Sequence, residues 1–302
     1  MTGTSNRLLL IHHAASGQTP RPPNSLWALQ ACLEAGARAV EVDISPLADG
    51  EFVLLHGQDL EQETTGVGPI GARRASEVRG LRHVWQGEVT EAPVGLLDEA
   101  LALLARYPQP VELQLDLKPY IPLTEATLAR LVATLQPLRE RVRVSSVADW
   151  VLRRLRTLDP ELPLGFDPLL YLAVDSTEER DPREPPFRRG AYGYWDEHPL
   201  ATWRWGETAD YLAARAEALW AQAPSGAVWY IAARLLARAL DDGFDWITDL
   251  HRRGAQVAAW TLDASQPEQA ALARRLAALG VDRITTNDAP ALARQLERPV
   301  VY

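Results

Sequence analysis

Residues 111–118 read VELQLDLK, and the pattern of this segment is the starting point for inferring the fold. Apolar and polar side chains alternate along it: Val111, Leu113, Leu115 and Leu117 are apolar, and Glu112, Gln114, Asp116 and Lys118 are polar. Successive side chains of a β-strand point to opposite faces, so the pattern predicts a strand with one apolar and one charged face. Residues 39–44, AVEVDI, repeat the pattern, because Glu41 and Asp43 share one face and the valines and isoleucine share the other.

Strand-like and helix-like segments alternate along the chain, which favours a parallel α/β fold. Helical patterns begin at Ser25, Leu123 and Glu268. Eight strands with intervening helices predict a single-domain (β/α)8 TIM barrel over residues 1–302, with a doubly wound open sheet as the main alternative. No Walker loop is present, so the nucleotide chemistry that such a loop gives that alternative is not expected. We expect the strands near residues 7–12, 38–44, 112–118, 142–146, 163–167, 227–231, 256–261 and 282–285.

Two segments depart from simple strand–helix alternation. Asp49-Gly50 is a strong turn signal, and it predicts a β-hairpin excursion after the second strand, formed by GEFVLLHG. Folding back about this turn would pair residues whose numbers sum to 99 and place Asp43 opposite His56. Segment 173–226 is rich in proline, charge and aromatic residues, so we expect a long loop insertion. Its two alternatives are a lid over the site and a capping loop with a small aromatic core of its own.

Composition and charge narrow the class of protein. The 302-residue chain has a formal net charge of −9, which disfavours nucleic acid as a partner. No stretch reaches the ~20 apolar residues of a transmembrane span, and the apolar run at 8–11 is too short for a signal peptide. We therefore expect a cytoplasmic protein. The single cysteine, Cys32, excludes an intramolecular disulfide. The sequence gives no prediction of oligomeric state.

The charged strand faces should point into the barrel, because the faces that pack against helices must be apolar. A buried carboxylate is costly unless it has a partner. One solution is a structural ion network with Lys118 and neighbouring arginines. The other is a divalent cation held by Glu41, Asp43 and Asp116, near the carboxyl ends of two strands, where active sites of this fold lie. Oxygen ligands favour Ca²⁺ or Mg²⁺, with Mn²⁺ as a further candidate.

Two histidines end predicted strands at the same edge. His12 ends the first strand, and His56 ends the hairpin strand that we expect to face it. An imidazole titrates near ~6.5, so a pair can divide acid and base roles at neutral pH. A lone histidine is more often a satisfied polar group, but a pair beside three carboxylates favours catalysis. The segment 139–156 holds Ser145-Ser146 and several arginines, interpreted as a strand end and solvated faces: Arg139, Arg141, Arg143, Arg153, Arg154 and Arg156.

Five motifs in this order resemble the glycerophosphodiester phosphodiesterases, metal-dependent TIM-barrel hydrolases of the phospholipase-C-like superfamily. They are IHHAASG with PPNS, VEVDISPLADGEFVLLHG, LQLDLKP, AAWTLD and GVDRITTNDAP. The resemblance covers most of the chain but not segment 173–226. It implies His12, His56 and Lys118 as catalytic residues, His13 and Trp260 as substrate-binding residues, and Glu41, Asp43 and Asp116 as metal ligands.

Several positions depart from the family pattern. His13 stands in place of an arginine, Ala14 of a glycine, Pro23 of a glutamate, Gly57 of an aspartate and Asp116 of a glutamate. Asp116 is one methylene shorter, and His13 can grip phosphate only when protonated, so we expect an altered substrate or a lower pH preference.

The resemblance implies hydrolysis of a small-molecule glycerophosphodiester to glycerol phosphate and an alcohol. One histidine would deprotonate the attacking hydroxyl, and the other would protonate the leaving alkoxide. Two alternatives stay open: a metal-free phospholipase-C-type lyase, and a binding protein that keeps the barrel without turnover. Contact of the aromatic segment 187–205 with lipid headgroups would instead favour lysophospholipid substrates.

Overall fold

The computed structural model describes residues 7–17, 20–118, 120–175, 183–297 and 299–302. Eight parallel strands follow one another by hydrogen bonding from β1 through β11, β10, β9, β8, β7 and β6 to β2, and a β1–β2 pairing closes the barrel. The predicted TIM barrel is therefore confirmed, and the open-sheet alternative is wrong. Each strand begins and ends within two residues of its expected range: β1 Leu8–His12, β2 Ala39–Pro46, β6 Glu112–Leu117, β7 Val142–Ser146, β8 Leu164–Phe166, β9 Val228–Ala232, β10 Val257–Trp260 and β11 Arg283–Thr286.

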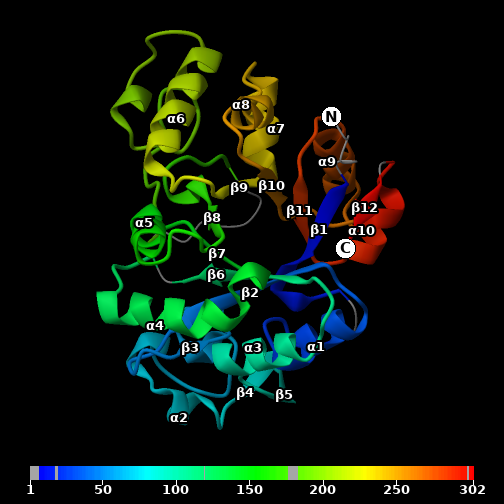
Figure 1. Ribbon diagram of the computed structural model, residues 1–302. Coiled ribbons are helices and arrows are strands. Elements are labelled where there is room, and N and C mark those ends of the chain that lie inside the picture. The colour runs from blue at the N-terminus through cyan, green and yellow to red at the C-terminus, as the bar shows by residue number, and fades with distance from the viewer. Residues whose placement is uncertain (1–6, 18–19, 119, 176–182, 298) are drawn as a thin grey trace.

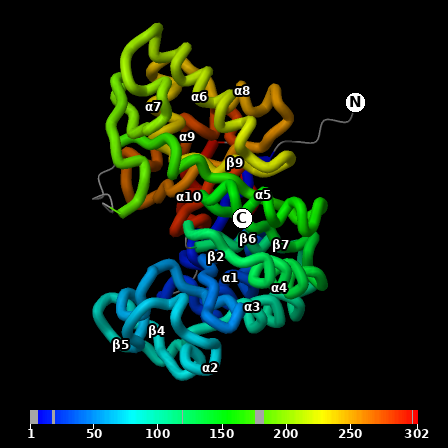
Figure 2. The backbone as a smooth tube through the Cα atoms, turned by 90° about the vertical axis from the view of Figure 1, so that its left-hand side faces the viewer, coloured from blue at the N-terminus to red at the C-terminus, as the bar shows by residue number. Residues whose placement is uncertain are grey.

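Helices surround the strands, as the two views at right angles show (Figures 1 and 2). The three predicted helix starts fall within two residues of α1, α4 and α9. Side-chain caps define two of these starts, because Ser25 Oγ and Thr124 Oγ1 accept N–H groups of the first turns. The helices are α1 Leu26–Glu34, α2 Ala75–Val78, α3 Leu97–Ala105, α4 Glu125–Leu135, α5 Asp149–Leu158, α6 Thr208–Gln222, α7 Ala233–Asp241, α8 Trp246–Arg252, α9 Pro267–Ala278 and α10 Ala289–Gln295. No helix in the described ranges is long and apolar enough to span a membrane.

The predicted hairpin follows β2, but its register differs by one residue. Strand β3 (Phe52–Val53) runs antiparallel to β2 and pairs Ser45 with Val53 and Pro46 with Phe52. The cause is Gly50, which takes a left-handed φ of +81° and closes the turn, so that Leu47 rather than Ala48 pairs with Glu51. The predicted alignment of Asp43 with His56 is therefore wrong.

The chain then extends well beyond a simple hairpin before it returns to the barrel. A short helix, α2, and a separate antiparallel pair, β4 (Arg82–Trp85) and β5 (Glu88–Pro93), follow β3. Figures 1 and 2 show these elements together at the lower end of the molecule. The remaining strand, β12 (Val300–Val301), pairs with the start of β1.

The insertion at 173–226 is more regular than predicted. Its second half contains α6, and its tyrosines join the main core rather than a separate one. The ring of Tyr192 stacks on that of Tyr211 in α6 with centroids 4.2 Å apart. Buried Asp196 accepts hydrogen bonds from Tyr211 and Arg215, which ties the irregular first half to the helix. The expectation of an independent aromatic core was wrong, and residues 176–182 of the proposed lid lie outside the described residues.

Candidate metal and catalytic site

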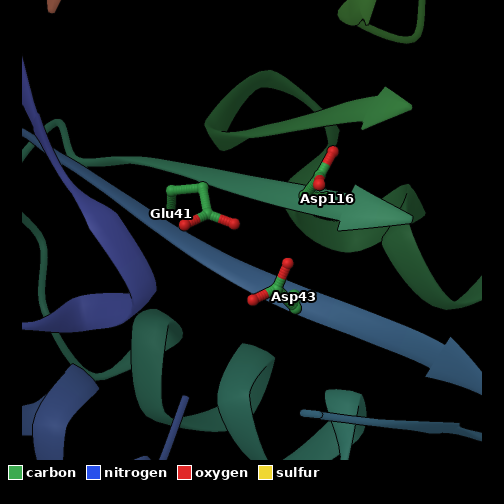
Figure 3. Close-up of side chains that lie close together, drawn as sticks. All are labelled: Glu41, Asp43 and Asp116. Carbon is green, nitrogen blue, oxygen red and sulfur yellow. The ribbon is translucent and has the colours of Figure 1, made fainter. Parts of the chain in front are cut away.

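Three carboxylates converge near the carboxyl ends of two adjacent strands. Figure 3 shows Glu41 and Asp43 on β2 and Asp116 on the neighbouring β6. One oxygen of each lies within 4.8 Å of the others. The parallel register places Asp43 directly beside Asp116, and the strand period of two puts Glu41 on the same lumenal face. The structure thus brings together the three residues that the strand pattern singled out.

The positive charge beside these carboxylates is insufficient to balance them. Among the described residues, Lys118 is the one lysine or arginine that pairs with them, with Nζ 2.7 Å from Asp116 and 3.7 Å from Asp43. Burial raises the pKa of Glu41 well above its usual value, and the Asp43 and Asp116 carboxylates raise it further. Burial alone would lower the pKa of Lys118, but Asp116 and Asp43 outweigh it and raise that pKa. The excess negative charge suits a divalent cation.

Neighbouring polar groups fix the carboxylates in place. Asn24, in the left-handed region with φ +57°, donates Nδ2–H to Asp43 at 2.8 Å and accepts the Asp43 backbone N–H at 3.0 Å. Ser145 Oγ donates to Asp116 at 2.8 Å and itself accepts from Gln114. Such outer contacts orient metal ligands. The sequence analysis assigned no site role to Asn24, which lies in the PPNS motif, or to Ser145, which it interpreted as part of a strand end.

His12 is fully buried, and one of its two ring nitrogens forms a hydrogen bond to the backbone. Its Nδ1 lies 3.1 Å from the Ser16 carbonyl oxygen. A carbonyl can only accept, so Nδ1 carries the proton and Nε2 of the neutral ring carries a lone pair. That Nε2 is buried and has no hydrogen-bond partner among the described residues. Burial lowers the His12 pKa, which favours the neutral ring at neutral pH.

His56 occupies a different setting from the predicted one. It follows the β3 return strand, which is anchored by a hydrogen bond from Ser45 Oγ to the Leu55 carbonyl. Its side chain is exposed, and its backbone N–H donates to the Glu63 carboxylate at 3.1 Å. The contacts described for His56 are therefore with Glu63 and not with Asp43.

His13 is linked to residues near the far end of the chain. Its Nδ1 lies 2.8 Å from Asn287 Oδ1, while Asn287 donates Nδ2–H to Asp263 at 2.8 Å. The carboxylate can only accept, so it fixes the amide orientation and makes His13 Nδ1 the donor. The other ring nitrogen, Nε2, lies 4.0 Å from Glu41 Oε2, so His13 faces the carboxylate cluster.

Trp260 and Asp167 complete the same edge of the barrel. Trp260 ends β10, and Asp167 directly follows β8. The pKa of Asp167 is raised to about 8, chiefly by burial and also by Asp116, against the opposing effects of the Leu169 backbone N–H, Lys118 and the Trp260 indole. The sequence analysis missed Asp167, although its place after a barrel strand is the signal that identified the other residues.

Comparison with known proteins agrees with this geometry. A model of the glycerophosphoryl diester phosphodiesterase family matches residues 12–291. The chain belongs to this family. It is 26% identical over 53% of its length to a Mycobacterium tuberculosis protein named probable glycerophosphodiester phosphodiesterase 1, and 25% identical over 54% to a Caldanaerobacter subterraneus glycerophosphodiester phosphodiesterase. The matches span 65% and 66% of those relatives' lengths, just under two thirds.

Solved structures share the fold over nearly the whole chain. An Oleispira antarctica phosphodiesterase, solved in complex with the product sn-glycerol-3-phosphate, superposes with a TM-score of 0.64 at 22% identity and covers 96% of each chain. A glycerophosphodiester phosphodiesterase from Agrobacterium tumefaciens gives a TM-score of 0.62 at 17% identity, covering 95% of this chain and 99% of that one. At these identities the likeness shows the fold.

Proposed function

We propose that this family member is a metal-dependent phosphodiesterase that hydrolyses glycerophosphodiesters to glycerol phosphate and an alcohol. The observation that carries the proposal is the cluster of three carboxylates paired with Lys118, on a barrel edge that also holds His12, whose Nε2 has no hydrogen-bond partner among the described residues. Family membership supports the reaction class. The product complex of the Oleispira antarctica relative supports glycerol phosphate as the product.

The residues present fit a divalent metal. Glu41, Asp43 and Asp116 would hold it, and their oxygen-only ligand set favours Ca²⁺ or Mg²⁺, with Mn²⁺ as a further candidate. When bound, such an ion polarises a non-bridging phosphate oxygen and stabilises the charge that develops there. Lys118 Nζ, already paired with Asp116, adds positive charge at the same place.

The two histidines divide the proton transfers. His12 acts as the general base, because its Nδ1–H is committed to Ser16 and its Nε2 lone pair is free. It takes the proton of the attacking hydroxyl, which belongs to water or to the substrate's own glycerol. His56, exposed at the edge of the site, protonates the leaving alkoxide. His13, when protonated, donates from Nε2 to the phosphate, and Trp260 packs against the glycerol moiety.

The first experiment measures glycerol phosphate released from glycerophosphocholine and glycerophosphoethanolamine. The protein is treated with EDTA, and Ca²⁺, Mg²⁺ or Mn²⁺ is then added back. Activity lost with EDTA and restored by one of these ions is the expected result. Activity that survives EDTA would favour a phospholipase-C-type lyase, and binding without release would favour a silent barrel.

A change of leaving group tests the assignment of the two histidines. A p-nitrophenyl phosphodiester of glycerol needs little protonation of its leaving group, so His56→Ala should lose about 10²-fold on glycerophosphocholine but far less on this ester. His12→Gln should lose about 10²-fold or more on both substrates. The reverse pattern of kcat ratios would exchange the two roles.

A further inference from the structure

The loop that follows His56 is held by side chains from a short helix, η2 (Leu60–Gln62), and the residue after it. Glu63 Oε1 accepts the N–H groups of His56 at 3.1 Å and Gly57 at 2.5 Å. Gln62 Oε1 accepts the next two N–H groups, those of Gln58 at 2.8 Å and Asp59 at 3.0 Å. Two adjacent side chains therefore accept four consecutive backbone N–H groups, and the Glu63 carboxylate accepts the two from His56 and Gly57.

Gly57 leaves the space beside the His56 backbone open to the side chains of Gln62 and Glu63. The family pattern stated above has an aspartate at this position, and glycine supplies no side chain. A Cβ built on Gly57 would lie 2.4 Å from Gln62 Oε1 and 3.2 Å from Glu63 Oε1. The space beside the histidine backbone is thus filled by the Gln62 amide and the Glu63 carboxylate, and any other residue at 57 would displace them.

The Glu63 side chain is itself half-buried. Burial raises its pKa, the N–H groups of Gly57 and His56 oppose the rise, and Asp43 is close enough to add to it. A half-buried carboxylate at this place is costly unless its hydrogen bonds offset the burial. Two converging N–H groups provide that compensation.

We propose that Glu63 is a positioning residue that fixes the backbone of His56, and so the reach of its imidazole. The inference rests on the proposed role of His56 in catalysis. The carboxylate acts through the backbone of residues 56 and 57 and does not touch the substrate.

The test compares Glu63→Ala with Glu63→Gln. Alanine removes both acceptor oxygens, whereas the glutamine amide oxygen can still accept the two N–H groups. We expect Glu63→Ala to lower kcat on glycerophosphocholine by about 10²-fold, the cost of a misplacement of roughly 1 Å, with KM little changed. Glu63→Gln should restore most of kcat. The matched control is Glu61→Ala, which removes an acceptor of the Gly68 N–H in the same loop but away from His56.

Hydrogen–deuterium exchange of the peptide covering residues 55–60 gives a readout independent of turnover. Exchange should accelerate in Glu63→Ala and stay slow in Glu63→Gln and Glu61→Ala. If the wild-type protein hydrolyses no diester, this measurement still tests the hydrogen bonds while the proposed function fails. Equal losses of kcat in Glu61→Ala and Glu63→Ala would overturn the proposal. So would unchanged kcat, or a Mn²⁺ affinity reduced as much as by removal of a cluster carboxylate, which would make Glu63 a metal ligand.

Discussion

Two regions of the barrel lumen hold buried carboxylates, and they differ in how much positive charge surrounds them. Towards the amino end of β6, Glu112 receives a two-pronged contact from Arg143 at 3.1 and 3.0 Å and a third hydrogen bond from Arg283 at 2.5 Å. The guanidinium groups outweigh burial and lower the pKa of Glu112 to about 2. Towards the carboxyl end, Glu41, Asp43 and Asp116 share Lys118, and burial leaves the pKa of Glu41 raised.

The ratio of cations to carboxylates separates the two regions. One carboxylate with two arginines is a closed ion network that fills the barrel and needs nothing further. Three carboxylates with one lysine are stable as ions only when more positive charge arrives. The sequence analysis offered these as competing interpretations of the same charged rows. The structure has an ion network at the amino end of the lumen, and at the carboxyl end it has a carboxylate cluster with the geometry of a cation site.

Replacing one carboxylate at each end of the barrel lumen by its amide should give the largest difference in activity. We expect Glu41→Gln to lower kcat/KM by about 10³-fold, because it removes a ligand from the group that would stabilise the transition state. The same change should raise the stability of the EDTA-treated protein at neutral pH, because it removes a buried and repelled charge. Kinetics, metal titration and thermal unfolding in EDTA measure these effects, with Glu112→Gln as the control that leaves metal affinity intact. If Glu41→Gln is less stable than wild type in EDTA, the claim that the Glu41 charge destabilises the metal-free protein is wrong.

The converse change, Glu112→Gln, should act on stability. It leaves Arg143 and Arg283 without their common carboxylate, and breaking such a pair costs about 3–5 kcal/mol. Denaturant unfolding at neutral pH measures this loss. The control is Glu91→Gln, which breaks an exposed pair with Arg82 at 2.8 Å and should cost less than about 1 kcal/mol. Equal losses would show that the lumenal network contributes no more than a surface ion pair.

The loss of folding stability at low pH should depend on Glu112. Its pKa is about 2 in the folded protein and 4.5 as the ordinary value, so the unfolded state binds the proton more readily. The contribution is therefore present above pH 4.5 and is lost as the pH falls towards 2, by about 3 kcal/mol at most. Unfolding free energies of wild type and Glu112→Gln, measured across this range, should converge as the pH falls. If the difference in unfolding free energy stays constant across this range, titration of Glu112 does not cause the loss of stability.

The sequence predicted the barrel well because its signals are periodic and local. The alternation in β2 and β6 fixed both the strands and the residues that face the lumen. The same alternation was available for Arg143, which lies between Val142 and Val144 in β7, yet it was interpreted as a solvated residue. The structure corrects this, because Arg143 points into the barrel and binds Glu112. That error came from grouping arginines by composition rather than by strand period.

Other features could not be predicted because they depend on backbone conformations or distant contacts. The hairpin register turned on whether Gly50 lies inside the turn or closes it, a one-residue choice that moved His56 away from Asp43. The bond between His13 and Asn287 joins residues 274 positions apart. The helix α6 was missed because segment 173–226 was treated as one irregular unit, although its second half is helical.

The smallest expected effect concerns a residue that touches the cluster without belonging to it. Ser145→Ala removes the hydroxyl that orients Asp116, and loss of such an outer contact weakens metal binding or activity by about 10-fold. Ser146→Ala is the matched control, because this buried neighbour donates instead to the Leu117 carbonyl. Mn²⁺ titration of both variants separates the contacts. If Ser145→Ala binds the ion as tightly as Ser146→Ala does, Lys118 and the strand backbone alone are sufficient to place Asp116, and the carboxyl-end cluster is more rigid than its hydrogen bonds suggest.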